Sequence, residues 1–205
     1  MTDKGYTRTI IDRIDEAAEG SVFVSSDFAN IANTETIRRT LNRLIEKGTI
    51  RRIIKGVFEK PKYSQLLNEK VAADPDLVAK AIARNYHWTI APSGLNALNL
   101  LGLSTQVPSV WTYVSDGPYR NYQWGNTQLK FKNRTNKEIT GLSYTTTLVV
   151  QALKTLEKEG VTPEIIQKLR SRLSESDKKA LLEEASESTD WVYDLLREIC
   201  ESENK

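Results

Sequence analysis

Side chains that can bind the phosphates and base edges of DNA gather in one stretch of the sequence. Residues 33–62 hold nine Lys or Arg against three Asp or Glu, a net charge of +6 in a chain whose formal net charge is +2. Guanidinium and carboxamide groups can pair with guanine and adenine in the major groove, and any cation can neutralise phosphate. This stretch therefore predicts a polyanionic partner, and its residue types favour double-stranded DNA.

A helix predicted over residues 33–47 would present most of these groups on one face. Ile37, Leu41 and Leu44 recur at helical spacing on the other face, which predicts their burial. Asn33 or Thr34 is a suitable N-cap, and Gly48 is a suitable residue just beyond the end. The side chains expected to contact DNA from this helix are Thr34, Thr36, Arg38, Arg39, Asn42, Arg43 and Lys47.

A β-hairpin is predicted directly after this helix. Residues 49–54 and 57–60 are rich in strand-forming residues, and Lys55-Gly56 between them is typical of a turn. The hairpin would bring Arg51, Arg52 and Lys55 to the DNA backbone or the minor groove, contacts that set register and salt-sensitive affinity.

The elements expected before this helix complete a recognisable order. A first helix is predicted over residues 7–18, a short strand over 22–24 and a brief helix over 27–31. Helix, strand, helix, helix and hairpin is the order of a winged helix-turn-helix, whose last helix enters the major groove. We therefore predict that residues 1–62 form a winged helix-turn-helix domain.

Residues 63–205 are predicted to form a second domain of mixed α/β structure with a helical C-terminus, so that the whole chain is α+β. A small antiparallel sheet is expected from strands over residues 110–114, 119–124 and 127–132. Helices are expected over residues 65–73, 75–86, 92–101, 145–159, 163–173, 175–186 and 189–201. Residues 154–205 are acidic, with nine Lys or Arg against 13 Asp or Glu, which indicates a solvated face or a protein-docking surface.

Three short stretches of the middle segment carry a family resemblance. They are Ile90-Ala91-Pro92-Ser93-Gly94, the run LGLSTQVP at residues 101–108, and the run YVSDGP at residues 113–118. With the predicted winged helix, they resemble the AbiEi-like antitoxin family, the transcriptional-regulator half of abortive-infection (type IV) toxin–antitoxin pairs. The resemblance spans roughly residues 5–160 and is strongest to a shorter branch of that family.

The resemblance implies a regulator that represses its own promoter, where it would bind inverted repeats, and that antagonises a nucleotidyltransferase-like toxin. It also implies which residues contact DNA: Arg38, Arg39, Arg43, Arg51 and Arg52. The acidic helical tail departs from the pattern of the longer family members, so the antitoxin activity is less directly implied than DNA binding.

The middle segment has a second group of cations and a group of aromatic residues. Arg120, Lys130, Lys132, Arg134 and Lys137 could extend the DNA footprint or meet an acidic partner. Lys130 and Lys132 would share one face of a strand because side chains alternate along it. The aromatic residues are either the core of a small sheet or a surface for a partner; they are Trp88, Trp111, Tyr113, Tyr119, Tyr122 and Trp124.

Residues suited to catalysis are sparse, and we expect no catalytic site, metal or cofactor. His87 is the one histidine and adjoins aromatic residues near a helix end, which favours a packing or capping role. Cys200 is expected to be buried in the last helix. Asp116, Gln128 and Lys130 weakly resemble the magnesium site of restriction-type nucleases, but Asp116-Gly117-Pro118 is also a turn signal. This nuclease and a protein-binding adaptor are the alternatives to a DNA-binding regulator.

The sequence also indicates the compartment. It has no run approaching the roughly 18 apolar residues of a membrane span, and no apolar segment typical of a signal peptide begins it. A cytoplasmic protein is therefore expected.

Overall fold

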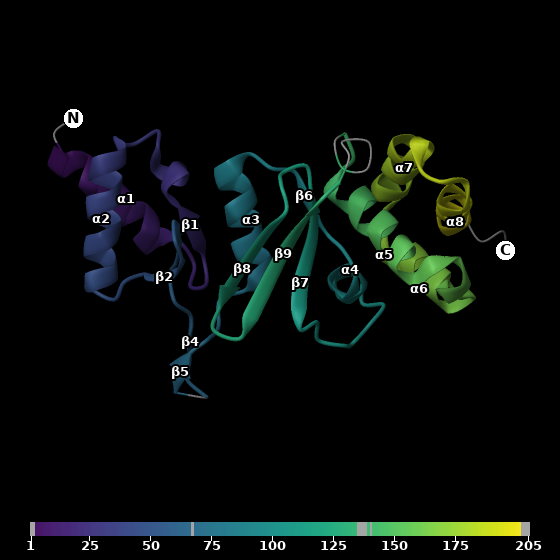
Figure 1. Cartoon of the computed structure of the whole chain (residues 1–205), viewed down its shortest axis with the longest axis horizontal. Coiled ribbons are helices and arrows are strands. Elements are labelled where there is room, and N and C mark those ends of the chain that lie inside the picture. Colours follow the sequence, from purple (N-terminus) through teal and green to yellow (C-terminus); the bar gives the residue numbers. More distant parts are fainter. Residues whose placement is uncertain (1–2, 67, 135–138, 140, 202–205) are drawn as a thin grey trace. The chain divides into compact units, whose positions relative to one another are not determined.

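The computed structural model describes the chain apart from residues 1–2, 67, 135–138, 140 and 202–205 (Figure 1). The protein is a mixture of helices and small sheets, as the sequence predicts. It divides into two compact units, the first made of residues 1–88 with 122–126 and the second of residues 89–121 with 127–205. Among the described residues, no helix combines the length and apolar character needed to cross a membrane.

The first unit begins with the elements predicted for the DNA-binding domain. They are α1 (Asp3–Glu16), β1 (Val22–Val24), the 3₁₀ helix η1 (Ser25–Phe28), α2 (Thr34–Glu46), β2 (Arg51–Ile54) and β3 (Val57–Glu59). Asn33 caps α2 through a hydrogen bond from the Thr36 N–H to its Oδ1, at 2.9 Å, and Gly48 just past the helix has a φ of +74°. The predicted helix over residues 33–47 is thus confirmed together with both of its ends.

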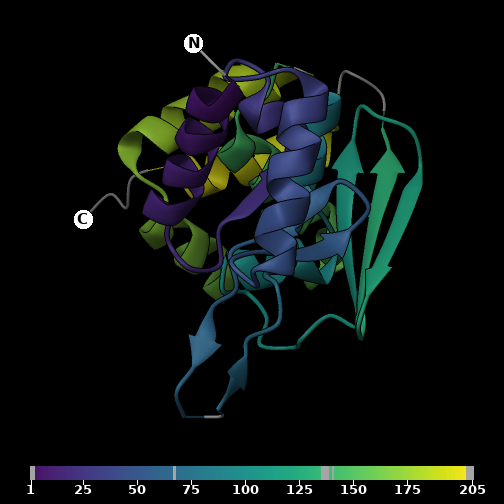
Figure 2. The same ribbon diagram turned by 90° about the vertical axis from the view of Figure 1, so that its left-hand side faces the viewer.

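One apolar core holds α1, α2 and the first sheet together. Ile10 and Ile14 of α1 and Ile37, Leu41 and Leu44 of α2 are all buried in it. Figure 2 shows α1 and α2 packed side by side. Because the core takes one stripe of α2, the charged residues of that helix are turned to solvent, whereas Thr36 and Thr40 are buried with the apolar stripe.

The first sheet has the strand order β1-β3-β2, with both pairings antiparallel. The β2–β3 hairpin turns at Lys55 and Gly56, where Gly56 has a φ of +83°. A bulge shifts its register between Arg52 and Ile54, so that Arg51 lies opposite Glu59 and Arg52 opposite Phe58. In this register Arg52 is exposed, whereas Arg51 is half-buried beside Glu59.

The prediction of a helix over residues 65–73 is wrong. These residues instead contribute to a two-stranded ribbon of β4 (Tyr63–Ser64) and β5 (Glu69–Lys70), which extends away from α1 and α2 (Figure 2). Asn68 at its turn has a φ of +52°, which a helix does not allow. The Val71 N–H donates to the Lys62 carbonyl at 2.9 Å, so the base of the ribbon is closed by a backbone hydrogen bond.

The helix α3 (Pro75–Tyr86) belongs to the first unit, which therefore extends beyond the predicted boundary at residue 62. It packs against β1, β3 and η1. Asp74 caps its start and Pro75 is its first residue, as expected for a helix N-terminus. His87 ends it in the left-handed conformation, with a φ of +56°, so the capping interpretation of this histidine is confirmed.

A four-stranded sheet has the order β6-β7-β9-β8; three of its strands belong to the second unit, whereas residues 122–124 of β8 are grouped with the first. Its strands are β6 (Ile90–Pro92), β7 (Val110–Ser115), β8 (Arg120–Trp124) and β9 (Thr127–Asn133), and the helix α4 (Leu95–Leu100) lies between β6 and β7. β6 pairs with β7 antiparallel, but β9 pairs with β7 in parallel. The sheet is mixed rather than wholly antiparallel because β9 inserts between β7 and β8.

The helical C-terminus is confirmed. It consists of α5 (Tyr144–Gly160), α6 (Pro163–Arg172), α7 (Glu175–Glu184), the 3₁₀ helix η3 (Ala185–Glu187) and α8 (Asp190–Cys200). These helices bury a shared core that includes Leu153, Leu169, Leu181 and Leu196. Cys200 is partly buried, as predicted, and burial raises the pKa of its thiol.

Candidate nucleic-acid interface

The outward face of α2 carries the cations that the sequence singled out. Arg38, Arg39, Arg43 and Lys47 are all exposed, with 66% of the Arg38 side chain and 72% of the Arg39 side chain accessible. They stand opposite the buried Ile37, Leu41 and Leu44. The helix thus offers a basic surface about two turns long, the length that a major groove can take.

Glu35 lies among these cations and organises two of them. Its Oε2 accepts from Arg38 Nε at 3.1 Å, and its Oε1 accepts from Arg38 Nη2 at 3.0 Å and from Arg39 Nε at 2.7 Å. The hydrogen bonds from Arg38 and then Arg39 lower the pKa of Glu35, and the same pairing raises the pKa of Arg38. The three side chains therefore form one charged cluster with a net charge of +1 at the start of the helix.

Asn42 connects the helix to the β2–β3 hairpin. Its Oδ1 accepts a hydrogen bond from Arg52 Nη2 at 3.0 Å. The Arg52 guanidinium also lies over the Phe58 ring, 5.6 Å from its centroid. Arg52 remains exposed and Asn42 is half-buried, and the hydrogen bond between them sets their relative orientation.

Arg51 was predicted to contact DNA, and the structure gives it another role. Its Nε forms an ion pair with Glu59, whose side chain is only 2% exposed, and its Nη2 donates to the Val71 carbonyl. A buried carboxylate needs a paired cation, because desolvation penalises an isolated charge. Arg51 therefore neutralises Glu59 and anchors the β4–β5 ribbon, so it is removed from the candidate interface.

The two threonines predicted to contact DNA differ in their exposure. Thr34 is exposed at the first residue of α2. Thr36 is only 8% exposed and lies on the core side of the helix, where its carbonyl accepts from Thr40 Oγ1 at 2.7 Å. Thr36 is therefore less accessible to a ligand than Thr34, because its position on the helix turns it inward. Lys55 is exposed at the tip of the hairpin, as predicted.

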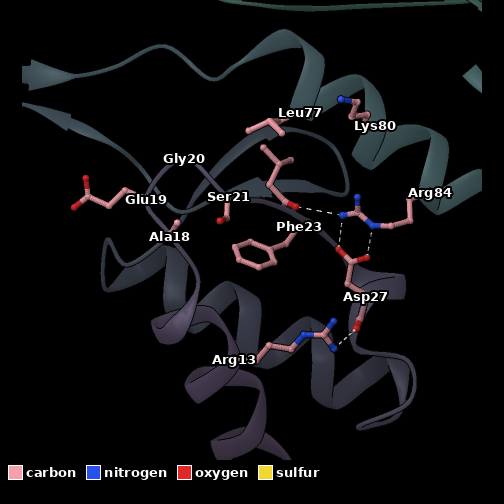
Figure 3. A pocket seen from close by; sticks show the side chains of 11 residues that line it. Arg13, Ala18, Glu19, Gly20, Ser21, Phe23, Asp27, Leu77, Lys80 and Arg84 are labelled. Carbon is pink, nitrogen blue, oxygen red and sulfur yellow. Dashed lines mark hydrogen bonds and ion pairs between the residues drawn. The ribbon is translucent and has the colours of Figure 1, made fainter. Parts of the chain in front are cut away.

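A salt bridge that the sequence did not reveal fixes α3 to η1 (Figure 3). Arg84 donates to both carboxylate oxygens of Asp27, from Nε at 2.7 Å and Nη2 at 2.8 Å, and Nη2 also donates to the Val22 carbonyl. Arg13 reaches the Asp27 carbonyl at 2.8 Å. Burial alone would raise the pKa of Asp27, but the hydrogen bonds from Arg84 and the Val24 N–H outweigh it and lower that pKa.

A pocket of about 590 Å³ opens beside this salt bridge. Arg13 from α1, Phe23 from β1, and Leu77, Lys80 and Arg84 from α3 contribute to its wall (Figure 3). Lys80 is itself paired with Asp76 at 2.6 Å. Of the cations around the pocket, Arg84 joins α3 to Asp27 and Val22, Arg13 joins α1 to Asp27, and Lys80 is paired within α3.

Comparison with known proteins places the sequence in a family. Residues 9–181 match the family described as "Family of unknown function (DUF6088)". This protein belongs to DUF6088. Among solved structures, the crystal structure of the RV2827C protein from Mycobacterium tuberculosis is similar with a TM-score of 0.43 and 11% identity, over 94% of this chain and 75% of that one. A search of curated proteins gives no match.

In this member of DUF6088, the second predicted basic patch lies on the second unit. Arg120, Lys132 and Arg134 are exposed, and Lys130 is half-buried beside them. Lys130 and Lys132 lie opposite Thr112 and Val114 of β7, and both alternate with the buried Leu129 and Phe131 as predicted. Lys137 falls outside the described residues.

The aromatic residues of the middle segment do not form one surface. Tyr113 is fully buried against Phe131, with ring centroids 6.0 Å apart, whereas Tyr119 is 70% exposed. Trp88 stacks on Tyr86 at the end of α3, with centroids 4.8 Å apart. The account of these residues as sheet core therefore fits Tyr113 and does not fit Tyr119.

The nuclease-like set is not assembled in this DUF6088 protein. Gln128 pairs with Val110 at one end of β7, whereas Asp116 follows Ser115 at the other. Six strand positions separate them, or about 20 Å. Asp116 Oδ1 instead accepts from the Thr89 N–H at 2.9 Å, in agreement with its role as a turn residue. Among the described residues, no group of three or more His, Cys, Asp or Glu side chains is placed to hold a metal ion.

Sequence reasoning missed two kinds of site residue. The role of Glu35 could have been read from its spacing, because Arg38 and Arg39 follow it by three and four residues and so face it on a helix. The Asp27–Arg84 pair joins residues 57 apart, and no local signal in the sequence marks it.

Proposed function

We propose that this protein binds double-stranded DNA and that residues 1–62 act as a winged helix-turn-helix, with α2 in the major groove. The observation that carries the proposal is the hydrogen bond between Asn42 of α2 and Arg52 of β2, which joins two elements that both expose cations. The exposed cations are Arg38, Arg39 and Arg43 on α2, and Arg52 and Lys55 on the hairpin. If the charged face of α2 were only a solvent-exposed surface, the adjacent hairpin would have no reason to carry exposed cations as well.

The roles follow from the chemistry of each group. Arg39, Arg43 and Asn42 lie on the exposed side of the helix that would enter the groove, where Arg can pair with guanine and Asn with adenine. Lys47, Arg52 and Lys55 lie toward the end of the helix and on the hairpin, where they would meet phosphates. Thr34 at the helix start completes this set.

The proposal uses fewer cations than the sequence offered. Arg51 is committed to Glu59, and the Lys60 ammonium group donates to the Asp15 and Ala17 carbonyls at the end of α1. The exposed cations that remain are still enough for about five phosphate or base contacts, a number that gives strongly salt-dependent binding.

We also propose that this DNA binding serves autoregulation, with the protein acting as the antitoxin of a toxin–antitoxin operon. The support is the resemblance of residues 90–94, 101–108 and 113–118 to AbiEi-like antitoxins. The partner would be a nucleotidyltransferase-like toxin encoded by the neighbouring gene. Co-expression tests this role: growth rescued from that toxin supports it, and growth arrest with both proteins present contradicts it.

The test of DNA binding is a mobility-shift titration of the full chain on the DNA upstream of its own gene. Low salt and an excess of unrelated competitor duplex reveal specific binding. We expect a shifted complex that survives the competitor. Absence of any complex at low salt would contradict the proposal.

A further inference from the structure

An acidic residue on the proposed DNA-binding face needs an explanation, because a carboxylate repels phosphates. Glu35 lies in the first turn of α2 with 48% of its side chain exposed, among the cations proposed to contact DNA. Capping does not require it, since Asn33 already accepts the Thr36 N–H. Its carboxylate is instead engaged by the two arginines that follow it.

The atoms in these hydrogen bonds show which donors Glu35 occupies. The Glu35 carboxylate accepts hydrogen bonds from Nε and Nη2 of Arg38 and from Nε of Arg39. A guanidinium is a planar fork whose outer edge is formed by Nη1 and Nη2. The hydrogen bonds to Glu35 use Nη1 of neither arginine and leave Nη2 of Arg39 and the second N–H of Arg38 Nη2 for other acceptors. Each can therefore offer its outer edge to guanine O6 and N7 while its inner side stays bound to the carboxylate.

Binding to phosphates would require the same two arginine side chains to move away from Glu35. An arginine that swings toward the backbone leaves its place beside Glu35, and both arginines together would break three hydrogen bonds. Non-specific binding depends on such phosphate contacts, whereas specific binding adds contacts to base edges. Glu35 thus penalises the non-specific mode more than the specific one, a repulsive element that favours the correct partner.

We propose that Glu35 sets the sequence selectivity of this protein, by holding Arg38 and Arg39 in position to read bases rather than phosphates. The proposal rests on the proposed DNA binding of α2. Glu35 is a positioning residue: it acts through the two arginines, and both base reading and the weakness of non-specific binding depend on it.

The experiment compares the full-length wild type with Glu35→Gln, which removes the charge while keeping the shape of the side chain. A random-sequence duplex library first identifies the preferred site of the wild type. The affinity of each protein is then measured for that site and for an unrelated duplex over a range of salt concentrations. Glu46→Gln is the matched control, because Glu46 is exposed on the same helix and its loss changes the net charge equally.

For Glu35→Gln, we expect affinity for unrelated DNA to rise about tenfold at low salt, with a salt dependence steeper by about one to two phosphate contacts. The ratio of specific to non-specific affinity should fall by a similar factor, and guanine preference should weaken at the positions the two arginines read. Glu46→Gln should leave that ratio within about twofold of the wild type.

Two results would overturn the inference while leaving DNA binding intact. In one, Glu35→Gln keeps the wild-type ratio; in the other, Glu46→Gln lowers the ratio just as far, so that charge alone explains the effect. If the wild type binds no duplex in the library, the proposed function falls and this inference falls with it.

Discussion

Arg52 on β2 donates a hydrogen bond from Nη2 to Oδ1 of Asn42 on α2, at 3.0 Å. The bond joins the hairpin to the exposed face of the helix, so that the two proposed DNA-contacting elements are oriented together. It also fixes the Asn42 carboxamide with its oxygen toward Arg52. The Nδ2 group of Asn42 is not used in this bond and would be a donor for adenine N7 if the helix entered a major groove.

Replacement of Arg52 should weaken DNA binding without unfolding the protein. Arg52→Ala removes one cation that would meet phosphate and also the bond to Asn42, and we expect affinity at low salt to fall about tenfold. Arg52→Lys keeps the charge but not the planar fork, so it should recover only part of this loss. Equal affinities for the lysine variant and the wild type would show that charge, not positioning, is what Arg52 supplies.

Replacement of Arg51 should lower the stability of the protein rather than its affinity for DNA. Arg51→Ala leaves the Glu59 carboxylate buried without its cation, and we expect the free energy of unfolding to fall by about 2 kcal/mol. Adding Glu59→Gln should restore part of it, because the uncompensated charge is then gone. Urea denaturation of both single variants and the double variant measures this coupling. An Arg51→Ala protein as stable as the wild type but defective in DNA binding would contradict our assignment.

The difference between these two arginines shows where sequence reasoning stopped. Composition placed both on the hairpin strand that follows α2, and that placement is confirmed. A regular two-residue turn at Lys55-Gly56 would set Arg52 opposite Glu59, but the bulge sets Arg51 there instead. A bulge depends on packing around the whole strand, so the sequence pattern predicted the element and not the register.

The Asp27–Arg84 salt bridge should make stability depend on pH. The pKa of Asp27 lies below its ordinary value of 3.8 in the folded protein. The carboxylate therefore stabilises the fold above that value, and the stabilisation is lost as the pH falls through the lower folded-state pKa. Asp27→Asn should reduce the free energy of unfolding near pH 7 by about 1.5 kcal/mol, the scale of a hydrogen bond to a charged group.

The same variant provides its own internal check. In acid, Asp27 of the wild type becomes protonated and loses its advantage over asparagine, so the difference between the two proteins should shrink toward about pH 3. Urea titrations at both pH values measure it. A difference that stays constant with pH would mean that Asp27 contributes through shape rather than charge.

The cap of α2 should be needed for the stability of the first unit. Asn33→Ala removes the acceptor of the Thr36 N–H and should cost about 1 kcal/mol, whereas Asn33→Asp should retain most of the stability because aspartate also caps helices. Thermal denaturation of the three proteins is the measurement. Loss of stability in the aspartate variant equal to that in the alanine variant would rule out the capping role.

The largest error in the fold concerned the segment after the hairpin. Residues 65–73 contain good helix formers, yet the segment forms a ribbon whose base is held by Arg51 Nη2 and the Val71 carbonyl. The extension of the first unit to α3 was missed for a related reason. It depends on Arg84 and on packing against β1 and η1, contacts between residues far apart in the sequence. Local periodicity located helices well and carried little information about such long-range contacts.

The most direct test of the central claim is the salt dependence of DNA binding by the Arg38→Ala, Arg43→Ala double variant. Both side chains are exposed on α2, so their loss should spare folding. The control is Lys168→Ala with Lys179→Ala, which removes two exposed cations from α6 and α7.

We predict that the α2 variant binds at least about 30-fold more weakly than the wild type, with a log–log salt slope shallower by about two contacts. The control should bind within about threefold of the wild type. If both variants bind alike, or if the α2 variant keeps the wild-type slope, then α2 is not the surface that meets DNA.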